Sequence, residues 1–145
     1  MVTTMNWLPQ SENQFIQCSE DLRLRIFDVR DDIIEPTHSI VTGTNFVQCT
    51  DIDKSGNYIL TGHKGFNNEG CSVKMWDIRK FTEGEVEPVF EYQRSFSVVS
   101  TRFMNTDMII TGTADKKLST IDMKGKHKEE VSLDFSITSV APLRP

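Results

Sequence analysis

The feature that most limits the fold is a short segment that occurs three times in altered form. The middle copy, Cys71–Arg79, alternates between apolar and polar side chains and ends in Trp-Asp-Ile-Arg. The copies Leu22–Arg30 and Lys117–Lys124 end in Phe-Asp-Val-Arg and Ile-Asp-Met-Lys. Alternation is typical of β-strands, because successive side chains point to opposite faces of a sheet. The repeats therefore predict a fold in which one β unit recurs.

The distance between the copies sets the size of that unit. The bulky residue before the aspartate is Phe27, then Trp76, then Ile121, so the steps are 49 and 45 residues. A four-stranded propeller blade takes roughly 40–45 residues, and loops account for the excess. Short runs rich in Val, Ile, Thr and aromatic residues alternate with turn residues, and no stretch has the 3.6-residue period of a helix. The chain is therefore predicted to be all-β.

Three units of four strands are expected, followed by the first strand of a fourth. The units cover about residues 1–42, 43–93 and 94–134, and the fourth begins within 135–145. Closed rings have about four to eight blades, so residues 1–145 are predicted to form one partial propeller, whose open faces the rest of a ring or another chain covers. The expected strands are Val2–Trp7, Gln14–Cys18, Leu22–Asp28, Ser39–Thr42, Phe46–Ile52, Tyr58–Thr61, Cys71–Arg79, Val89–Tyr92, Val98–Met104, Met108–Thr113, Leu118–Met123, Glu130–Leu133 and Ile137–Ala141.

Composition disfavours several classes of partner. The formal net charge is −5 and the pI is near 5.2, whereas nucleic acids and anionic membrane surfaces bind basic faces. No apolar run approaches the ~20 residues of a membrane-spanning helix, so no membrane insertion is expected. Three cysteines, an odd number, and a start without a charged-then-apolar leader indicate a reducing, cytoplasmic compartment.

The residue types that bind metals or perform catalysis are scattered. No two of the cysteines and histidines have CxxC or HxxxH spacing, and Cys18 and Cys49 fall at strand positions where burial is expected. Thr42–Thr44 and Lys64–Gly65 lack the spacing and the following helix of a phosphate-binding loop. No catalytic activity, metal or cofactor is therefore expected. The residues that this spacing disfavours as metal ligands are Cys18, Cys49, Cys71, His38, His63 and His127.

The repeat resembles that of the WD-repeat (WD40) β-propeller family. The family pattern is small-Gly-small-x-Asp, followed six residues later by an aromatic residue and Asp. The three units show it at Thr111–Asp115 with Ile121-Asp122, at Gln17–Asp21 with Phe27-Asp28 and, without the turn aspartate, at Thr61-Gly62 with Trp76-Asp77. The resemblance covers nearly the whole chain and implies a non-catalytic scaffold for protein interactions.

In that family a His before the first strand, a Ser or Thr of the second strand, the turn Asp and the Trp form a hydrogen-bonded set within one blade. None of the units is assigned the family's Gly-His dipeptide, so the set is expected to be incomplete throughout. Trp7 and Trp76 are expected in the core, because a buried aromatic ring removes ~150–250 Å² from water. The turn aspartates are expected to accept backbone N–H bonds. The residues given structural roles are Asp21, Thr61, Trp76, Asp77, Thr111 and Asp115.

One insertion departs from the general repeat. Residues Lys64–Gly70 join the second and third strands of the middle unit, and such loops emerge on the same propeller face as those joining fourth to first strands. An exposed ring there offers contact area at low entropic cost, although a tolerated surface insertion is the alternative. Solvated charges at Asp31-Asp32 and Lys80–Glu87 are expected on the opposite face. The residues predicted to bind a protein partner are Asn45, Lys64, Phe66, Asn67, Phe96 and Phe135.

Two segments carry a closer resemblance. Val2–Arg30 and Gly65–Arg79 are similar to the later blades of a cilia-associated WD-repeat protein, which implies a cilium or flagellum as a possible setting. Three functions stay open. The first is a scaffold or assembly component, part of a larger propeller in a cytoplasmic or ciliary complex. The others are a structural element of a large assembly such as an axoneme, with blades completed by another chain, and a cytosolic regulatory binding module unrelated to cilia. In each case the expected partners are other proteins.

Overall fold

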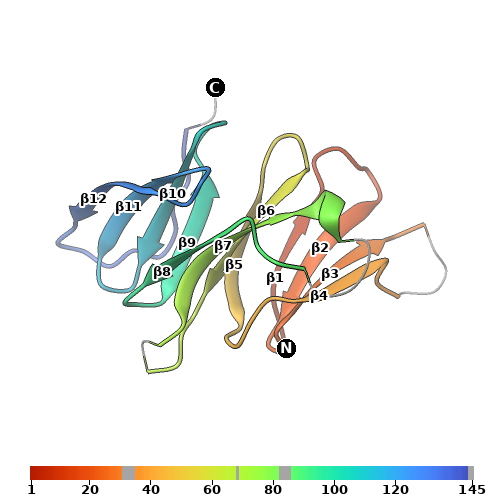
Figure 1. The fold of residues 1–145 in the computed structure, drawn as a ribbon, viewed down its shortest axis with the longest axis horizontal. Helices are drawn as coiled ribbons and strands as arrows, with labels where there is room; N and C mark the ends of the chain where they lie inside the picture. The colour runs from red at the N-terminus through yellow and green to blue at the C-terminus, as the bar shows by residue number, and fades with distance from the viewer. Residues whose placement is uncertain (31–34, 68, 82–85, 144–145) are drawn as a thin grey trace.

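The fold consists of three β-sheets that follow one another along the chain. The computed structural model describes residues 1–30, 35–67, 69–81 and 86–143, and each sheet has four antiparallel strands. The sheets are numbered 1 to 3 in chain order, as β1–β4, β5–β8 and β9–β12, and Figure 1 shows sheet 2 between the other two. Within each sheet, neighbouring strands are consecutive in sequence, so each sheet is a meander of three hairpins. The all-β prediction is confirmed.

The strands have the following bounds. Sheet 1 contains β1 (Val2–Trp7), β2 (Gln14–Ser19), β3 (Arg23–Asp28) and β4 (His38–Val41). Sheet 2 contains β5 (Val47–Ile52), β6 (Tyr58–His63), β7 (Cys71–Asp77), the 3-10 turn η1 (Ile78–Lys80) and β8 (Phe90–Arg94). Sheet 3 contains β9 (Val98–Phe103), β10 (Met108–Thr113), β11 (Lys117–Asp122) and β12 (His127–Ser132).

Each sheet carries a row of three side chains that lie opposite one another on its first three strands. The third member of each row is the bulky residue of the sequence repeat. The rows are Trp7–Phe15–Phe27 in sheet 1, Ile52–Ile59–Trp76 in sheet 2 and Phe103–Ile109–Ile121 in sheet 3. All six side chains of the sheet 2 and sheet 3 rows are buried. The repeat in sequence therefore corresponds to a repeat in packing.

Two apolar layers form the core. The layer between sheets 1 and 2 joins the sheet 2 row to Ile16 and Leu24 of sheet 1. The layer between sheets 2 and 3 joins the sheet 3 row to Leu60 and Val73 of sheet 2. Ile59 and Leu60 are neighbours on β6 and point into different layers, because side chains alternate along a strand. Sheet 2 is therefore buried on both faces.

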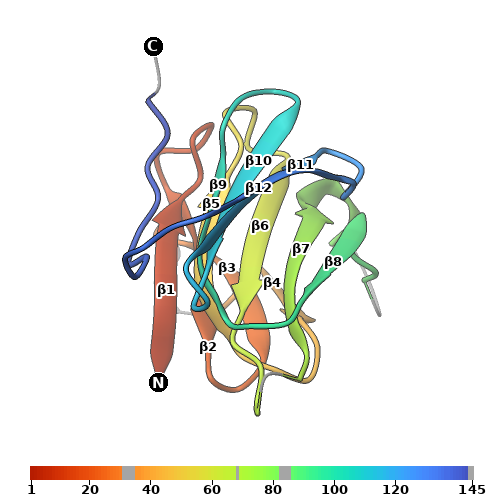
Figure 2. The same ribbon diagram turned by 90° about the vertical axis from the view of Figure 1, so that its left-hand side faces the viewer.

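The first strands of the three sheets lie next to one another, and Figure 2 shows β1, β5 and β9 on the same side of the molecule. Asn6 Nδ2 and Arg102 Nη1 both donate to the carbonyl oxygen of Thr50, at 3.3 and 2.6 Å. The backbone N of Phe103 donates to the carboxylate of Asp51 at 2.8 Å. These bonds link β1 to β5 and β5 to β9, so the sheets are held together at their first strands.

Trp7 is 60% exposed, so the prediction that it lies in the core is wrong. Its ring packs edge-on against Phe15, with centroids 5.5 Å apart, and Phe15 stacks on Phe27 at 5.2 Å. This row alternates along the strands with Ile16 and Ile26, which face sheet 2. The row therefore lies on the far face of sheet 1, where none of the described strands covers it.

Residues 133–143 form no strand, so the prediction of a further strand at Ile137–Ala141 is wrong for this structure. Among the strands that the structure describes, none of a fourth unit lies beside this segment to supply ladder hydrogen bonds. It packs instead on the far face of sheet 3, where the backbone N of Val140 donates to Ser100 Oγ at 3.1 Å.

This tail takes the place that a next first strand would take. A Cβ added at Gly62 of β6 would lie 2.7 Å from Val98, which belongs to the first strand of the following sheet. A Cβ added at Gly112, at the same place on β10, would lie 2.8 Å from Ile137 of the tail. Both glycines therefore let the next segment of chain approach the sheet closely.

The aspartate of the repeat ends each third strand by the same contact. Its Oδ1 atom accepts a hydrogen bond from the backbone N–H two residues later, which closes a tight turn. The pairs are Asp28 with Arg30 at 3.0 Å, Asp77 with Arg79 at 3.1 Å and Asp122 with Lys124 at 2.9 Å. The aspartate recurs in the sequence because the same turn recurs in the structure.

Candidate protein-interaction site

A line of hydrogen bonds runs from the core of sheet 2 to the loop before β5. Trp76 Nε1 donates to Thr61 Oγ1 at 2.9 Å. Thr61 Oγ1 lies 3.0 Å from Nε2 of His63, and Nδ1 of His63 lies 2.9 Å from the carbonyl oxygen of Asn45. The three side chains of Trp76, Thr61 and His63 are buried. Strands β6 and β7 position them, and the line ends at the surface.

The carbonyl of Asn45 sets the direction of these bonds. A carbonyl only accepts, so His63 donates from Nδ1, and Nε2 accepts the hydroxyl proton of Thr61. Burial lowers the pKa of His63 to about 4, against the opposing effect of the bond to Asn45, and the charge of Lys74 lowers it further. His63 is therefore neutral near pH 7, in the one tautomer that satisfies both of its partners.

His63 is the member of this line of hydrogen bonds that the sequence reasoning missed. The prediction that no unit has a Gly-His dipeptide is wrong, because Gly62-His63 is one and its imidazole bonds with Thr61. A signal was present, because Thr61 and His63 are two residues apart and side chains at that spacing share one face of a strand. The imidazole therefore reaches Thr61 from the end of the second strand.

Sheet 3 lacks the donor that would complete the same set. Thr111 occupies on β10 the place of Thr61 on β6, and it is fully buried. Ile121 lies at the position in sheet 3 that Trp76 has in sheet 2, and its aliphatic side chain has no N–H group to donate. In the part of the chain that the structure describes, Thr111 Oγ1 has no hydrogen-bond partner. A buried hydroxyl without a partner is destabilising.

The insertion after β6 forms a small hairpin that holds Phe66 in solvent. The backbone groups of Phe66 and Glu69 exchange hydrogen bonds of 3.1 and 2.9 Å, and the Phe66 side chain is 77% exposed. Asn67 follows at a positive φ of 49°. The side-chain amide of Asn45 donates to the carbonyls of Glu69 and Gly70, at 3.3 and 3.4 Å. The hairpin is thus tied to the residue that ends the buried line of bonds.

The other residues predicted to contact a partner lie at the same end of the strands. The backbone N of Lys64 donates to the carbonyl of Phe46 at 3.2 Å, and its Nζ lies 5.8 Å from the centre of the Phe46 ring. Phe96 lies between β8 and β9, and Phe135 follows β12, both exposed. The structure therefore brings together Asn45, Lys64 and the hairpin. Phe96 lies in the connection from sheet 2 to sheet 3, Phe135 follows sheet 3, and neither takes part in these bonds.

The turn aspartates lie at equivalent hairpins of sheets 1 and 3. Asp21 binds the guanidinium of Arg25, a hydrogen bond that lowers the pKa of its carboxyl group. Asp115 accepts a hydrogen bond from the hydroxyl of the threonine that ends β10. The residues that follow them, Leu22 and Lys116, have positive φ angles of 65° and 64°. The two aspartates therefore lie at turns of the same shape.

The cysteines are placed where thiol chemistry is disfavoured. Burial raises the pKa of Cys18 and of Cys49 to about 12, so both thiols stay protonated near neutral pH. Among the described residues, no group of three or more His, Cys, Asp and Glu is arranged to hold a metal ion. Within the same ranges, no helix has the length and apolar character needed to cross a bilayer.

The charged loops expected at the other end of the strands are described only in part. Asp31-Asp32 lies outside the described residues, as do residues 82–85 of the Lys80–Glu87 loop. Arg79 of η1 binds Asp77 at 2.8 Å, and its guanidinium carbon lies 5.4 Å from the centre of the Tyr58 ring. This arginine is therefore held against sheet 2.

No model of a protein family matches the chain, and none of the curated proteins matches it. The sheets, the rows and the hairpin therefore carry the functional argument.

Proposed function

We propose that this chain is part of a WD-repeat β-propeller that acts as a non-catalytic scaffold for other proteins. Three consecutive four-stranded antiparallel sheets, joined at their first strands, support an assignment of each sheet as one blade. The bonds between Trp76, Thr61 and His63 support the family, because they form a variant of its hydrogen-bonded set. In this variant the imidazole comes from the end of the second strand.

The observation that carries the proposal is the uncovered aromatic row Trp7–Phe15–Phe27 on sheet 1, in which Trp7 is exposed and the two phenylalanines are half-buried. The equivalent rows of sheets 2 and 3 are buried because the preceding sheet covers each of them. Removing apolar surface from water contributes about 25 cal/mol per Å², so covering the row is favourable. Sheet 1 is therefore suited to packing beneath a further blade, supplied by the same ring or by another chain.

Size-exclusion chromatography with light scattering tests this proposal. The isolated chain of 16.6 kDa is expected to self-associate through the open row, and Trp7→Ser is expected to reduce the association. Val29→Ser is the matched control, because Val29 is also exposed but lies outside the row. A compact monomer that Trp7→Ser leaves unchanged would contradict the proposal.

The face that presents Phe66 is the proposed surface for protein partners. A ring that acts as a binding hot spot contributes ~2 kcal/mol or more, so Phe66→Ala should weaken binding by about 30-fold. Co-purification of partners with the tagged full-length protein from cells is the assay, with Phe66→Ala, Phe96→Ala and the control Val29→Ala. Retention of every partner by both phenylalanine variants would exclude this face.

The open row of sheet 1 also favours a second candidate, a structural element of a large assembly such as an axoneme. In that case another chain completes the blades, and the protein stays with the assembly when membranes are dissolved with detergent. A scaffold of a soluble cytoplasmic or ciliary complex is released by the same treatment. A tagged protein found only in the cytosol would favour a regulatory binding module with no relation to cilia.

A further inference from the structure

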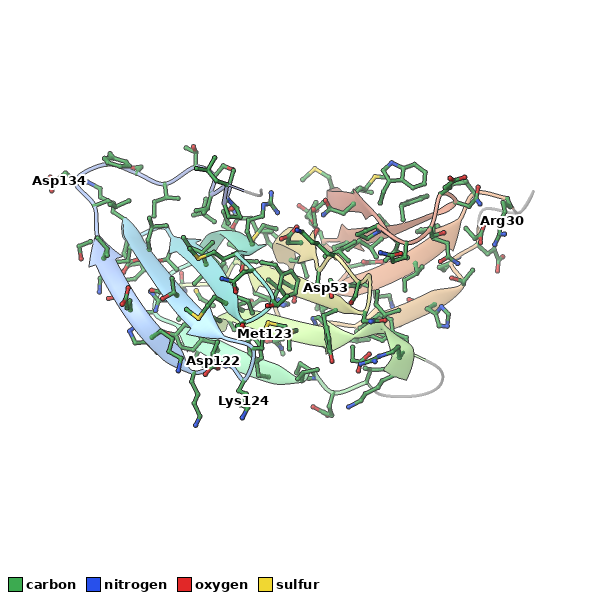
Figure 3. The ribbon with its side chains drawn as sticks, turned by 90° about the horizontal axis from the view of Figure 1, so that it is seen from above. Arg30, Asp53, Asp122, Met123, Lys124 and Asp134 are labelled. Carbon is green, nitrogen blue, oxygen red and sulfur yellow. The ribbon has the colours of Figure 1, made fainter. Side chains whose placement is uncertain are left out.

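A pocket of about 470 Å³ lies between sheets 2 and 3, at the opposite end of the strands from the Phe66 hairpin. The β5–β6 turn, the end of β9 and the loop after β11 line it, and its apolar walls include Tyr58, Phe103, Met104 and Met123. Figure 3 shows Asp53 of sheet 2 close to Met123 of sheet 3 at this end. The volume falls in the range of about 300–1,000 Å³ that is usual for ligand pockets.

The corresponding gap between sheets 1 and 2 is filled by the chain itself. Leu8 and Phe81 are buried there and belong to the apolar layer between these sheets. Gln10 Nε2 also donates to the carbonyl of Lys54 at 2.8 Å, which joins the β1–β2 turn to the β5–β6 turn. The aromatic side chain of Phe81 and the aliphatic side chain of Leu8 therefore occupy the gap between sheets 1 and 2 that is equivalent to the pocket between sheets 2 and 3.

The sequence explains why the second gap stays open. The residue that follows the first-strand member of the row is the apolar Leu8 in sheet 1, but it is the polar Asp53 in sheet 2. Phe81 follows η1, whereas the chain of sheet 3 reverses within Asp122–Lys126, where the backbone N of Asp122 donates to the carbonyl of Lys126 at 2.9 Å. Sheet 3 therefore has no residue at the place of Phe81.

The polar groups of the lining are bonded within their own turns. The carboxylate of Asp53 accepts the backbone N–H of Tyr58 at 2.8 Å, and the amide oxygen of Asn105 accepts that of Met108 at 2.9 Å. The charged members of the lining, Asp53 and Lys54, have opposite signs. The pocket therefore offers apolar surface with a balanced charge, which is complementary to an uncharged apolar group.

We propose that this pocket binds an aromatic side chain presented by a peptide segment of a protein partner, as Phe81 fills the equivalent gap within the chain. Methionine side chains adapt to the shape of a bound group and make favourable sulfur contacts with aromatic rings, which suits Met104 and Met123 to this role. The proposal depends on neither the aromatic row of sheet 1 nor the Phe66 hairpin. It assigns a second interaction site at the other end of the strands.

Titration of the full chain with an uncharged peptide, followed by ¹H–¹⁵N NMR, tests the proposal. The probe is acetyl-Gly-Gly-Phe-Gly-amide, and its control has Ala in place of Phe. The Phe peptide is expected to shift the backbone signals of Ser55, Met104 and Asn105, and the Ala peptide is expected to bind at least tenfold more weakly. Met104→Glu, which places a carboxylate at the apolar wall, should also weaken binding of the Phe peptide at least tenfold.

The matched variant is Val29→Glu, which adds the same charge at an exposed site on sheet 1 and is expected to bind the peptide unchanged. Comparison of the spectra without peptide shows whether Met104→Glu keeps the fold; if it does not, Met104→Gln takes its place in the same titration. The proposal is overturned by equal shifts from the Phe and Ala peptides, or by binding that the Met104 variant leaves intact. It is also overturned if toluene shifts these signals and the Phe peptide does not, because the pocket would then select small molecules.

Discussion

The hydroxyl groups of Thr61 and Thr111 offer a matched test of the bonds in sheet 2. Both threonines are fully buried at the same position of the second strand in their sheets. Thr61 Oγ1 bonds with Trp76 and His63, whereas Thr111 Oγ1 has no partner in the described part of the chain. Replacing each by Val keeps the branched shape and strand preference and removes the hydroxyl.

The two replacements are expected to have different effects on the free energy of unfolding. Thr61→Val leaves the indole N–H of Trp76 and Nε2 of His63 buried without partners, and each such group costs about 1–3 kcal/mol. We therefore expect a loss of about 2–4 kcal/mol, less than the full sum because the site can relax. Thr111→Val removes a group that has no partner, so it should be neutral or stabilising by up to about 1 kcal/mol.

Urea unfolding followed by tryptophan fluorescence measures both values, and linear extrapolation gives the free energies. The cycle Thr61→Val with Trp76→Phe then isolates the bond between them, with an expected coupling of about 1 kcal/mol or more. Equal losses for Thr61→Val and Thr111→Val would refute the reasoning, because shape alone would then explain both. A Thr61→Val protein within about 0.5 kcal/mol of the parent would refute it too, since that is the range of an ordinary surface change.

Three further outcomes are expected. The pKa of His63 falls from 6.5 to about 4 on folding, so the unfolded chain binds more protons between these values and stability drops as the pH falls from 6.5 to 4. The free energy of unfolding should fall by about 3 kcal/mol over this range. Urea midpoints measured across it should show this fall in the parent protein but not in His63→Gln, and parallel pH profiles of the two proteins would contradict the prediction. Gly62→Ala should destabilise the chain more than Gly112→Ala, because its Cβ would collide with Cys49 Sγ and lie 2.7 Å from Val98, which belong to paired strands, whereas that of Gly112 meets Ile137 at 2.8 Å, in a segment without ladder hydrogen bonds. Thermal melts that rank the two variants in reverse would contradict this order. Alkylation of Cys18 by iodoacetamide at pH 7.5 should be at least 100-fold slower in the folded chain than in urea, because burial raises its pKa and blocks access; comparable rates would mean that the layer between sheets 1 and 2 opens readily.

Features with a local cause could be predicted from the sequence. The strands follow from period-two alternation between turn residues, and most expected boundaries agree within two residues. β12 is the exception and begins three residues earlier, at His127. The recurring aspartate also has a local cause, because Asp77 bonds with a backbone N–H only two residues away. Patterns of this kind need no knowledge of the neighbouring sheet.

Features that depend on a neighbouring sheet could not be predicted in the same way. Trp7 has the composition of a core residue, but its burial depends on a sheet that would precede it. Residues 137–141 have the composition of a strand, but a strand needs a partner for its hydrogen bonds. The pocket beside Met123 likewise exists because neither the β5–β6 turn nor the turn after β11 places a large apolar side chain between sheets 2 and 3. Neither turn is unusual by itself.

Asn45 joins the core of sheet 2 to the exposed hairpin, and this bears on what the hairpin is for. Its carbonyl accepts from His63, and its amide donates to the carbonyls of Glu69 and Gly70. Gly70 has a φ of 73°, and a Cβ there would collide with the amide of Asn45, so this approach requires glycine. An insertion that was merely tolerated would have no need of bonds to the buried line that begins at Trp76. The hairpin that carries Phe66 is therefore tied to the core of sheet 2, which supports the proposal that it is held ready for a partner.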